Sequence, residues 1–126
     1  MNSNTEFYPT VPVQDLDRAK KFYIEILGFS VMDESVPGIA MMENTTHGKL
    51  MLFQRPPTKA DHAIIGFVVY IDEAIDELVS KGIHMEQYDM GEGMKTDERG
   101  ILRYGATAAA WFKDTEGNIL SLHGKI

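Results

Sequence analysis

The feature that most constrains the fold of this chain is an internal repeat, because one order of predicted elements occurs twice in halves of similar length. In each half, the pattern of apolar and turn residues predicts a strand, then a helix, then three more strands. In the first half these are a strand over 7–13, a helix over 15–28 and strands over 29–34, 38–44 and 48–54. A doubled unit of this kind is typical of two modules that share one core or one cleft.

The helix of the first half has clear end signals. Asp15 precedes the apolar periodicity and can cap the helix, and Gly28 can end it. The second half repeats the pattern, with Asp72 as the expected cap. Its predicted elements are a strand over 63–71, a helix over 73–82 that Gly82 ends, a strand over 83–89 and a hairpin of 107–112 with 119–122.

The hairpin contains the sequence WFKDTEGNILSLH, residues 111–123. Asp114 can start a type I turn, and Gly117 can take the left-handed conformation that closes it. After the turn, Ser121 shares one face of the strand with Ile119 and His123, because side chains alternate along a strand.

A long segment with mixed charges and several glycines, residues 89–105, separates the predicted strand 83–89 from this hairpin. Loops of this length in small domains are often binding loops or covers. Residues 101–104 also suit a strand extension. The sequence therefore leaves two alternatives open, a lid over a cavity and an added strand.

Bulk properties exclude several classes of protein. A chain of 126 residues suits one domain, and a net charge of −7 argues against nucleic-acid binding. There is no cysteine, so disulfides and thiolate sites are excluded, and no apolar run is long enough to span a bilayer. The first ten residues lack the features of a secretory signal, so we expect a cytoplasmic protein without membrane partners.

Two motifs around the repeat resemble one known group. The sequence VQDLDRAKKFYIEILGF (13–29) and the hairpin WFKDTEGNILSL (111–122) resemble those of the vicinal oxygen chelate superfamily, with Thr115 where the family often has proline. This superfamily includes glyoxalase I, extradiol dioxygenases, fosfomycin-resistance proteins and bleomycin-binding proteins. The resemblance covers nearly the whole chain. It implies an α+β fold of two βαβββ modules whose curved mixed sheets surround a cavity, here one domain over 1–126 with module one at about 5–57, a connector at 58–62 and module two at about 63–126.

The resemblance also implies where a metal would be bound. Carried over one position at a time, the four ligand positions fall at or near Tyr8, Met51, Gly66 and Ser121. This set does not suit a divalent ion, which prefers imidazole and carboxylate ligands. We therefore predict no cofactor and no metal centre of the usual kind, and a displaced divalent-metal site remains the alternative.

The same resemblance predicts the lining of a small-molecule pocket. Trp111 is either a core residue or a platform on which a ligand ring stacks. Arg99 and Arg103 either belong to a solvated charge cluster or grip an anionic group if the segment 89–105 closes over the cavity. The other predicted ligand-binding residues are Tyr8, Thr10, Met51, Phe53, Ser121 and His123.

Two functions remain open. In the first, the protein sequesters an apolar or aromatic compound, which its negative charge allows to be cationic, without a metal and as a homodimer. In the second, it is an enzyme of the lyase, isomerase or dioxygenase type in which Tyr8, Ser121 or His123 performs acid–base chemistry. Binding without catalysis is the favoured interpretation.

Overall fold

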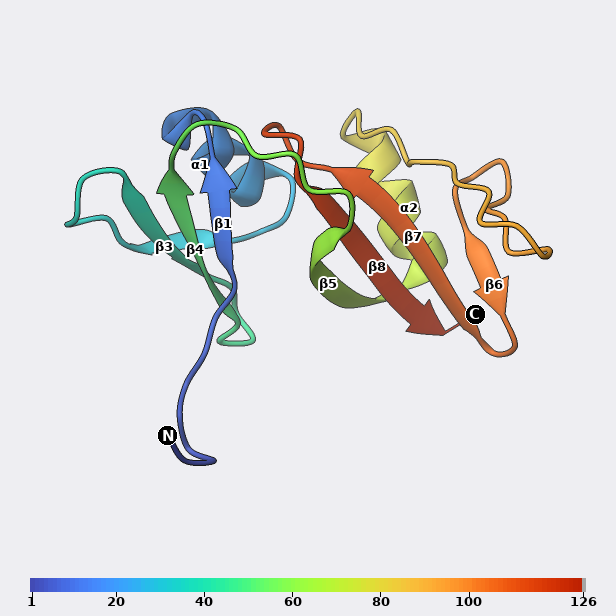
Figure 1. The fold of residues 1–126 in the computed structure, drawn as a ribbon, viewed down its shortest axis with the longest axis horizontal. Helices are drawn as coiled ribbons and strands as arrows, with labels where there is room; N and C mark the ends of the chain where they lie inside the picture. The colour runs from blue at the N-terminus through green and yellow to red at the C-terminus, as the bar shows by residue number, and fades with distance from the viewer. Residues whose placement is uncertain (126) are drawn as a thin grey trace. The chain divides into compact units, whose positions relative to one another are not determined.

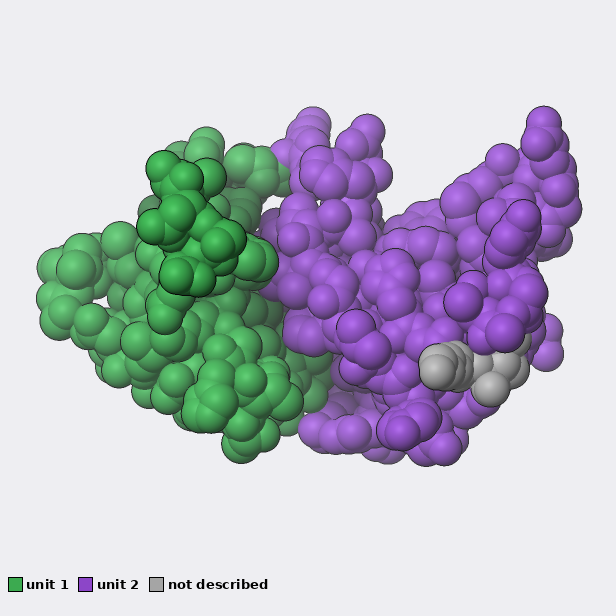
Figure 2. Space-filling model, turned by 90° about the horizontal axis from the view of Figure 1, so that it is seen from below, with its two compact units in different colours: residues 1–58 green, residues 59–126 purple. Residues whose placement is uncertain are grey.

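A computed structural model describes residues 1–125, which form two compact units. Unit 1 comprises Met1–Thr58, and unit 2 begins at Lys59. Figure 1 shows the fold of each unit, and Figure 2 colours unit 1 green and unit 2 purple. In each unit a four-stranded mixed sheet is accompanied by one helix. The predicted α+β class is therefore confirmed.

Unit 1 has the predicted order of elements. Its strands are arranged β1-β4-β3-β2, and only the pairing of β1 with β4 is parallel. The elements are β1 (Thr10–Val13), α1 (Leu16–Glu25), β2 (Ser30–Asp33), β3 (Ile39–Glu43) and β4 (Lys49–Gln54).

The ends of α1 follow the sequence signals. Asp15 is the N-cap, and its side chain accepts a hydrogen bond from the backbone N–H of Arg18. Gly28 follows the helix with a φ of 77°, a conformation that glycine adopts without steric cost.

One face of the unit 1 sheet forms the core. Along β4 the buried Leu50 and Leu52 alternate with the half-buried Met51 and Phe53. Burying such alternating apolar side chains gives roughly 1.5–3 kcal/mol each. The core also includes Val11, Val13, Ala19, Phe22, Tyr23, Ala40 and Met42.

Unit 2 contains the second helix and a sheet of order β5-β8-β7-β6, in which β5 is parallel to β8. Leu120, Leu122, Ala110 and Phe112 are buried, as are Ile71, Ile75 and Leu78 on the helix. The elements are β5 (Ala63–Tyr70), α2 (Ile71–Ser80), β6 (Leu102–Tyr104), β7 (Thr107–Lys113) and β8 (Ile119–Lys125).

Two predictions for unit 2 are wrong. Residues 83–89 do not form a strand; β6, from the segment 89–105, instead pairs with the first part of β7. The backbone N–H of Glu86 nevertheless donates to the carbonyl of Trp111 at 2.8 Å, so residues 83–89 still meet the edge of β7. Asp72 does not cap α2, because the helix begins at Ile71, two residues earlier than predicted, and its N-cap is Tyr70, which makes no side-chain cap bond.

The hairpin turn between β7 and β8 forms as predicted. Asp114 is 6 % exposed, and one of its carboxylate oxygens accepts the backbone N–H groups of Glu116 and Asn118 at 2.8 and 2.9 Å. Gly117 closes the turn with a φ of 83°. These bonds fix the register in which β7 faces β8.

Among residues 1–125, no helix has both the length and the apolar content that a bilayer span requires.

Candidate functional site

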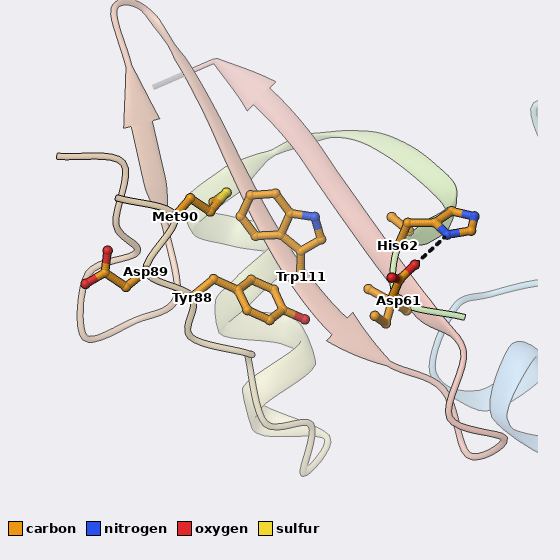
Figure 3. A pocket seen from close by; sticks show the side chains of 8 residues that line it. Asp61, His62, Tyr88, Asp89, Met90 and Trp111 are labelled. Carbon is orange, nitrogen blue, oxygen red and sulfur yellow. Dashed lines mark hydrogen bonds and ion pairs between the residues drawn. The ribbon is translucent and has the colours of Figure 1, made fainter. Parts of the chain in front are cut away.

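A hollow of about 330 Å³ opens on the sheet of unit 2, on the face whose side chains alternate with the core residues. This volume is at the lower end of the range of small-molecule pockets. We call it the Trp111 hollow. Its lining consists of Asp61, His62, Ala63, Tyr88, Asp89, Met90, Trp111 and Ile119 (Figure 3).

Two aromatic rings form the wall of the Trp111 hollow. The ring centroids of Tyr88 and Trp111 are 5.6 Å apart, and the ring planes meet at 73°. This edge-to-face arrangement is a favourable one for aromatic pairs. Figure 3 shows Met90 and Asp89 on the same segment as Tyr88. The wall therefore offers ring faces and a thioether to an apolar ligand.

Tyr88 is held in place by hydrogen bonds to Thr96 across a short hairpin over residues 88–96. Its backbone N–H donates to Oγ1 of Thr96 at 2.8 Å, and the backbone N–H of Thr96 donates to its carbonyl at 3.0 Å. Thr96 is only 6 % exposed. Burial, together with the nearby carboxylate of Glu86, raises the pKa of the Tyr88 phenol above its ordinary value. The phenol therefore stays neutral over the physiological pH range.

The opposite side of the Trp111 hollow is polar. Nδ1 of His62 lies 3.4 Å from a carboxylate oxygen of the exposed Asp61, and Figure 3 shows both residues before β5. A second carboxylate, that of Asp89, belongs to the Tyr88 segment on the other side of Trp111 (Figure 3) and accepts the backbone N–H of Gly91 at 3.0 Å. The hollow thus joins an aromatic wall to acidic groups, a combination that suits a cationic ring system.

A hydrogen-bonded pair lies next to Trp111 on the same sheet face. Trp111 and Gly66 are both register partners of Ser121. Oγ of Ser121 lies 2.8 Å from Nε2 of His123 and 3.3 Å from the carbonyl oxygen of Ile65. The structure therefore brings together Trp111, Ser121 and His123, three of the residues that the sequence predicted for the site.

A second hollow, of about 350 Å³, lies on the other side of this pair. His123 contributes to its lining together with Tyr104 and Thr107. The full lining is Leu102, Tyr104, Thr107, Ala108, Ala109, His123 and Gly124. Ser121 and His123 therefore lie between two hollows of one unit.

The remaining predicted contact residues of unit 1 share one face of their own sheet. Thr10 is the register partner of Met51, and Pro12 that of Phe53, so the side chains of Thr10, Met51 and Phe53 lie on the face opposite the core. Tyr8 precedes β1 and its side chain is exposed. A ligand-binding role for these four residues stays a prediction.

The two predicted arginines contact α2. The guanidinium of Arg99 donates to Asp72 at 2.8 Å and also to Asp76. Arg103 lies 4.0 Å from the same carboxylate oxygen of Asp72. Their binding of an anionic ligand stays a prediction, and for Arg99 it would require both ion pairs to break.

Several lining residues were not among the predicted ones, chiefly Asp61, Tyr88 and Asp89. Tyr88 meets Trp111 through a contact across more than twenty residues, which no local pattern reports. The short hairpin that carries Tyr88 and Asp89 does have a local signal, because Gly91 and Gly93 both take positive φ values at its tip.

The positions that resemblance assigns to metal ligands do not fit a divalent ion. Gly66 has no side chain, Met51 offers a thioether, and only Tyr8 and Ser121 offer oxygen. Within residues 1–125, no group of three or more histidine, aspartate or glutamate side chains is placed to hold a metal.

Comparison with known proteins gives a consistent family. The sequence profile of the Glyoxalase/Bleomycin resistance protein/Dioxygenase superfamily matches residues 7–122. No curated protein sequence matches the chain significantly.

Similar solved structures include the glyoxalase family protein from Enterococcus faecalis, with 22% identity, a TM-score of 0.71 and coverage of 98% of this chain and 99% of that one. An integron cassette protein from the mobile metagenome of Halifax Harbour sewage outfall has 21% identity and a TM-score of 0.70, covering 96% and 98%. A mutant of the fosfomycin resistance protein FosX from Listeria monocytogenes, complexed with Mn(II) and a dihydroxypropylphosphonic acid, has 16% identity and a TM-score of 0.68, covering 98% and 90%. At these identities the similar structures show only that the fold is shared. The family is shown by the sequence profile, which matches residues 7–122. The chain therefore belongs to the glyoxalase/bleomycin resistance protein/dioxygenase superfamily.

Proposed function

We propose that this protein binds a small aromatic, positively charged compound in the Trp111 hollow and sequesters it without a metal centre. The observation that carries the proposal is the wall formed by Tyr88 and Trp111, whose ring centroids are 5.6 Å apart. A flat ligand gains apolar burial and ring contacts against such a wall. Met90 on the same rim can adapt to the outline of the ligand.

The charge of the ligand follows from the carboxylates around the hollow. Asp61 and Asp89 line it, and the whole chain carries a net charge of −7. Aromatic faces attract cations, and a negative surface raises the local concentration of cationic ligands. His62 beside Asp61 offsets part of this charge only when its ring is protonated.

The family supports a small-molecule role without fixing the ligand. The superfamily name includes bleomycin resistance, and the FosX structure contains a small phosphonic acid. FosX was crystallised with Mn(II), whereas the four positions that the family resemblance assigns to metal ligands in this chain do not suit a dication. We therefore propose binding rather than metal-dependent turnover.

Trp111 is the only tryptophan, so its fluorescence reports directly on the hollow. We would titrate the protein with a panel of aromatic cations, such as acridinium and phenanthridinium dyes, and with neutral compounds of matched shape. Saturable quenching by the cations, with at least about tenfold weaker binding of the neutral analogues, is the expected result.

The matched variants are Tyr88→Ala and Tyr104→Ala. Both remove a tyrosine from unit 2, but only Tyr88 lines the Trp111 hollow. Tyr88→Ala should weaken binding about tenfold or more, and Tyr104→Ala should leave it within a factor of two. Equal losses in both variants, or no saturable ligand in the panel, would contradict the proposal.

A homodimer and a metal-free state are further parts of the proposal, which native mass spectrometry tests together. Protein purified without chelator is expected as a dimer whose mass contains no divalent ion, before and after incubation with nickel, zinc, manganese or iron. One stoichiometric metal per subunit would contradict the metal-free assignment and support a displaced ligand set.

A further inference from the structure

We propose that Ser121 and His123 form a nucleophile–base pair that accepts the acyl group of a small activated carboxylic ester, such as an ester of a phenol. This activity is separate from the proposed binding of an aromatic cation and does not depend on it. It rests on three features: the distance between the two side chains, the opening beside them, and the hollows on either side.

The first feature is the geometry of the pair. Ser121 and His123 are two residues apart on β8, so both side chains project from the same face of the strand. The distance from Oγ to Nε2 is 2.8 Å, which is within the reach required of a nucleophile and its base. When Nε2 carries no proton, the hydroxyl donates to it; in the other tautomer, the hydroxyl donates to the carbonyl of Ile65, 3.3 Å away.

The second feature is the opening that Gly66 leaves. Ser121 itself is only 3 % exposed, whereas Gly66, its register partner on β5, is exposed. A Cβ placed on Gly66 would lie 3.4 Å from Oγ of Ser121 and 3.3 Å from Nε2 of His123. Any side chain at this position would therefore cover the pair. The glycine gives a small reagent a route to an otherwise shielded hydroxyl.

The third feature is the space around the pair. Trp111, the other register partner of Ser121, lines the 330 Å³ hollow, and His123 lines the 350 Å³ hollow. An ester centred on Ser121 therefore has room for an aromatic leaving group against Trp111 and for a short acyl chain beside His123. This arrangement selects small aryl esters rather than long-chain ones.

The reaction is acyl transfer. Oγ of Ser121 forms a bond to the ester carbonyl carbon while its proton passes to Nε2 of His123. The bond between that carbon and the phenolic oxygen then breaks, and the proton on Nε2 passes to the leaving oxygen. Water, activated by the same nitrogen, hydrolyses the acyl-serine and restores the pair. No oxidant, reductant or further reactant is needed.

The test uses p-nitrophenyl acetate with the full chain. The release of p-nitrophenol is followed by absorbance, and the acetyl group is located by mass spectrometry of the digested protein. The wild type should release the phenol at least about tenfold faster than Ser121→Ala and His123→Ala. In a sample quenched with acid during the first turnover, before water hydrolyses the acyl-serine, fragmentation of the peptide should place one acetyl group on Ser121 and not on His123.

Two further variants separate chemistry from folding. Gly66→Ala retains both side chains but covers them, so it should lose acetylation about tenfold while its circular dichroism stays unchanged. Ser80→Ala removes a hydroxyl that donates to the carbonyl of Glu77 at the end of α2, and its rate should equal that of the wild type.

Surface histidines acetylate slowly without any serine, so the site of modification decides the outcome. Equal rates in the wild type and Ser121→Ala would overturn the proposal, as would an acetyl group found only on histidine. Because the probe is a neutral ester, failure here leaves the binding of aromatic cations intact, and failure of that binding leaves this result intact.

Discussion

At the scale of single residues, the candidate site depends on side chains that face away from the helix-covered core. In β8 the apolar Leu120 and Leu122 point into the core, and Ser121 between them points to the open face. This alternation places a polar side chain beside Trp111 at no cost to the core.

Tyr88 gives a test of the wall at this scale. Its raised pKa, caused by burial and by the carboxylate of Glu86, means that the folded state prefers the neutral phenol. The raised pKa therefore contributes to the free energy of unfolding. This contribution is fully present below the pKa that Tyr88 has in the unfolded chain, and it is lost as pH rises through its pKa in the folded protein. The absorbance of ionised tyrosine, compared between the wild type and Tyr88→Phe, should show the Tyr88 transition above pH 10.0, its ordinary value.

Tyr88→Phe is also the control for binding, since it keeps the ring. We expect it to bind aromatic cations as the wild type does at pH 7 and to lose no affinity as pH rises to 10. A Tyr88 transition within or below the ordinary tyrosine range would show that the ring is solvated and that the wall is open.

At the scale of elements, the sequence predicted most of the fold because most elements have local signals. The cap at Asp15, the left-handed Gly28 and the turn from Asp114 to Gly117 are short-range features, and each lies where predicted. For Ser121 and His123, strand alternation was enough to predict a common face. That Trp111 shares this face follows from the register of β7 against β8, which the sequence did not predict.

The strand predicted over residues 83–89 does not form, and the reason is a contact with a segment that is distant in the sequence. Gly100, with a φ of 86°, lies so close that a Cβ on it would be 2.9 Å from the carbonyl oxygen of Glu86 and from Cβ of Met85. The loop before β6 therefore packs directly on this segment, and β6 takes the pairing with β7. Such a contact depends on where two distant segments meet, which an alternating pattern does not encode.

The same loop is tied to α2 by Arg99, whose guanidinium contacts Asp72 and Asp76. We expect Arg99→Ala to lower the free energy of unfolding by about 0.5–1 kcal/mol, since the partners are partly exposed. Arg103→Ala, which removes only a 4.0 Å contact to Asp72, should cost less than about 0.3 kcal/mol.

Urea denaturation followed by Trp111 fluorescence measures both variants. High salt should remove most of the difference between Arg99→Ala and the wild type, because it screens the ion pairs. A difference that persists unchanged at high salt would assign the role of Arg99 to packing rather than to charge.

At the scale of the whole molecule, charge is the property that acts on a ligand before contact. The chain has 19 acidic and 12 Lys and Arg residues, giving its net charge of −7. We expect the affinity for an aromatic cation to fall about fivefold between low salt and roughly 0.5 M salt, because screening shortens the reach of this field.

The neutral analogue of the same shape is the control for this measurement. Its affinity should stay constant or rise slightly with salt, because only apolar burial holds it. Equal salt dependence for the cation and the neutral compound would show that the carboxylates of Asp61 and Asp89 play no part in binding.

The strand order also has a consequence in time. β8 lies between β5 and β7 in its sheet, yet it is synthesised after every other described element of unit 2. During translation β5 therefore has no parallel partner until β8 has been synthesised. The β7–β8 hairpin, in contrast, can form within microseconds once both strands have left the ribosome. Unit 1 has its own central strand, β4, as soon as residue 54 is made. The first unit can thus fold while the second is still being translated, and the sheet of the second is complete only when β8 follows the turn at Asp114.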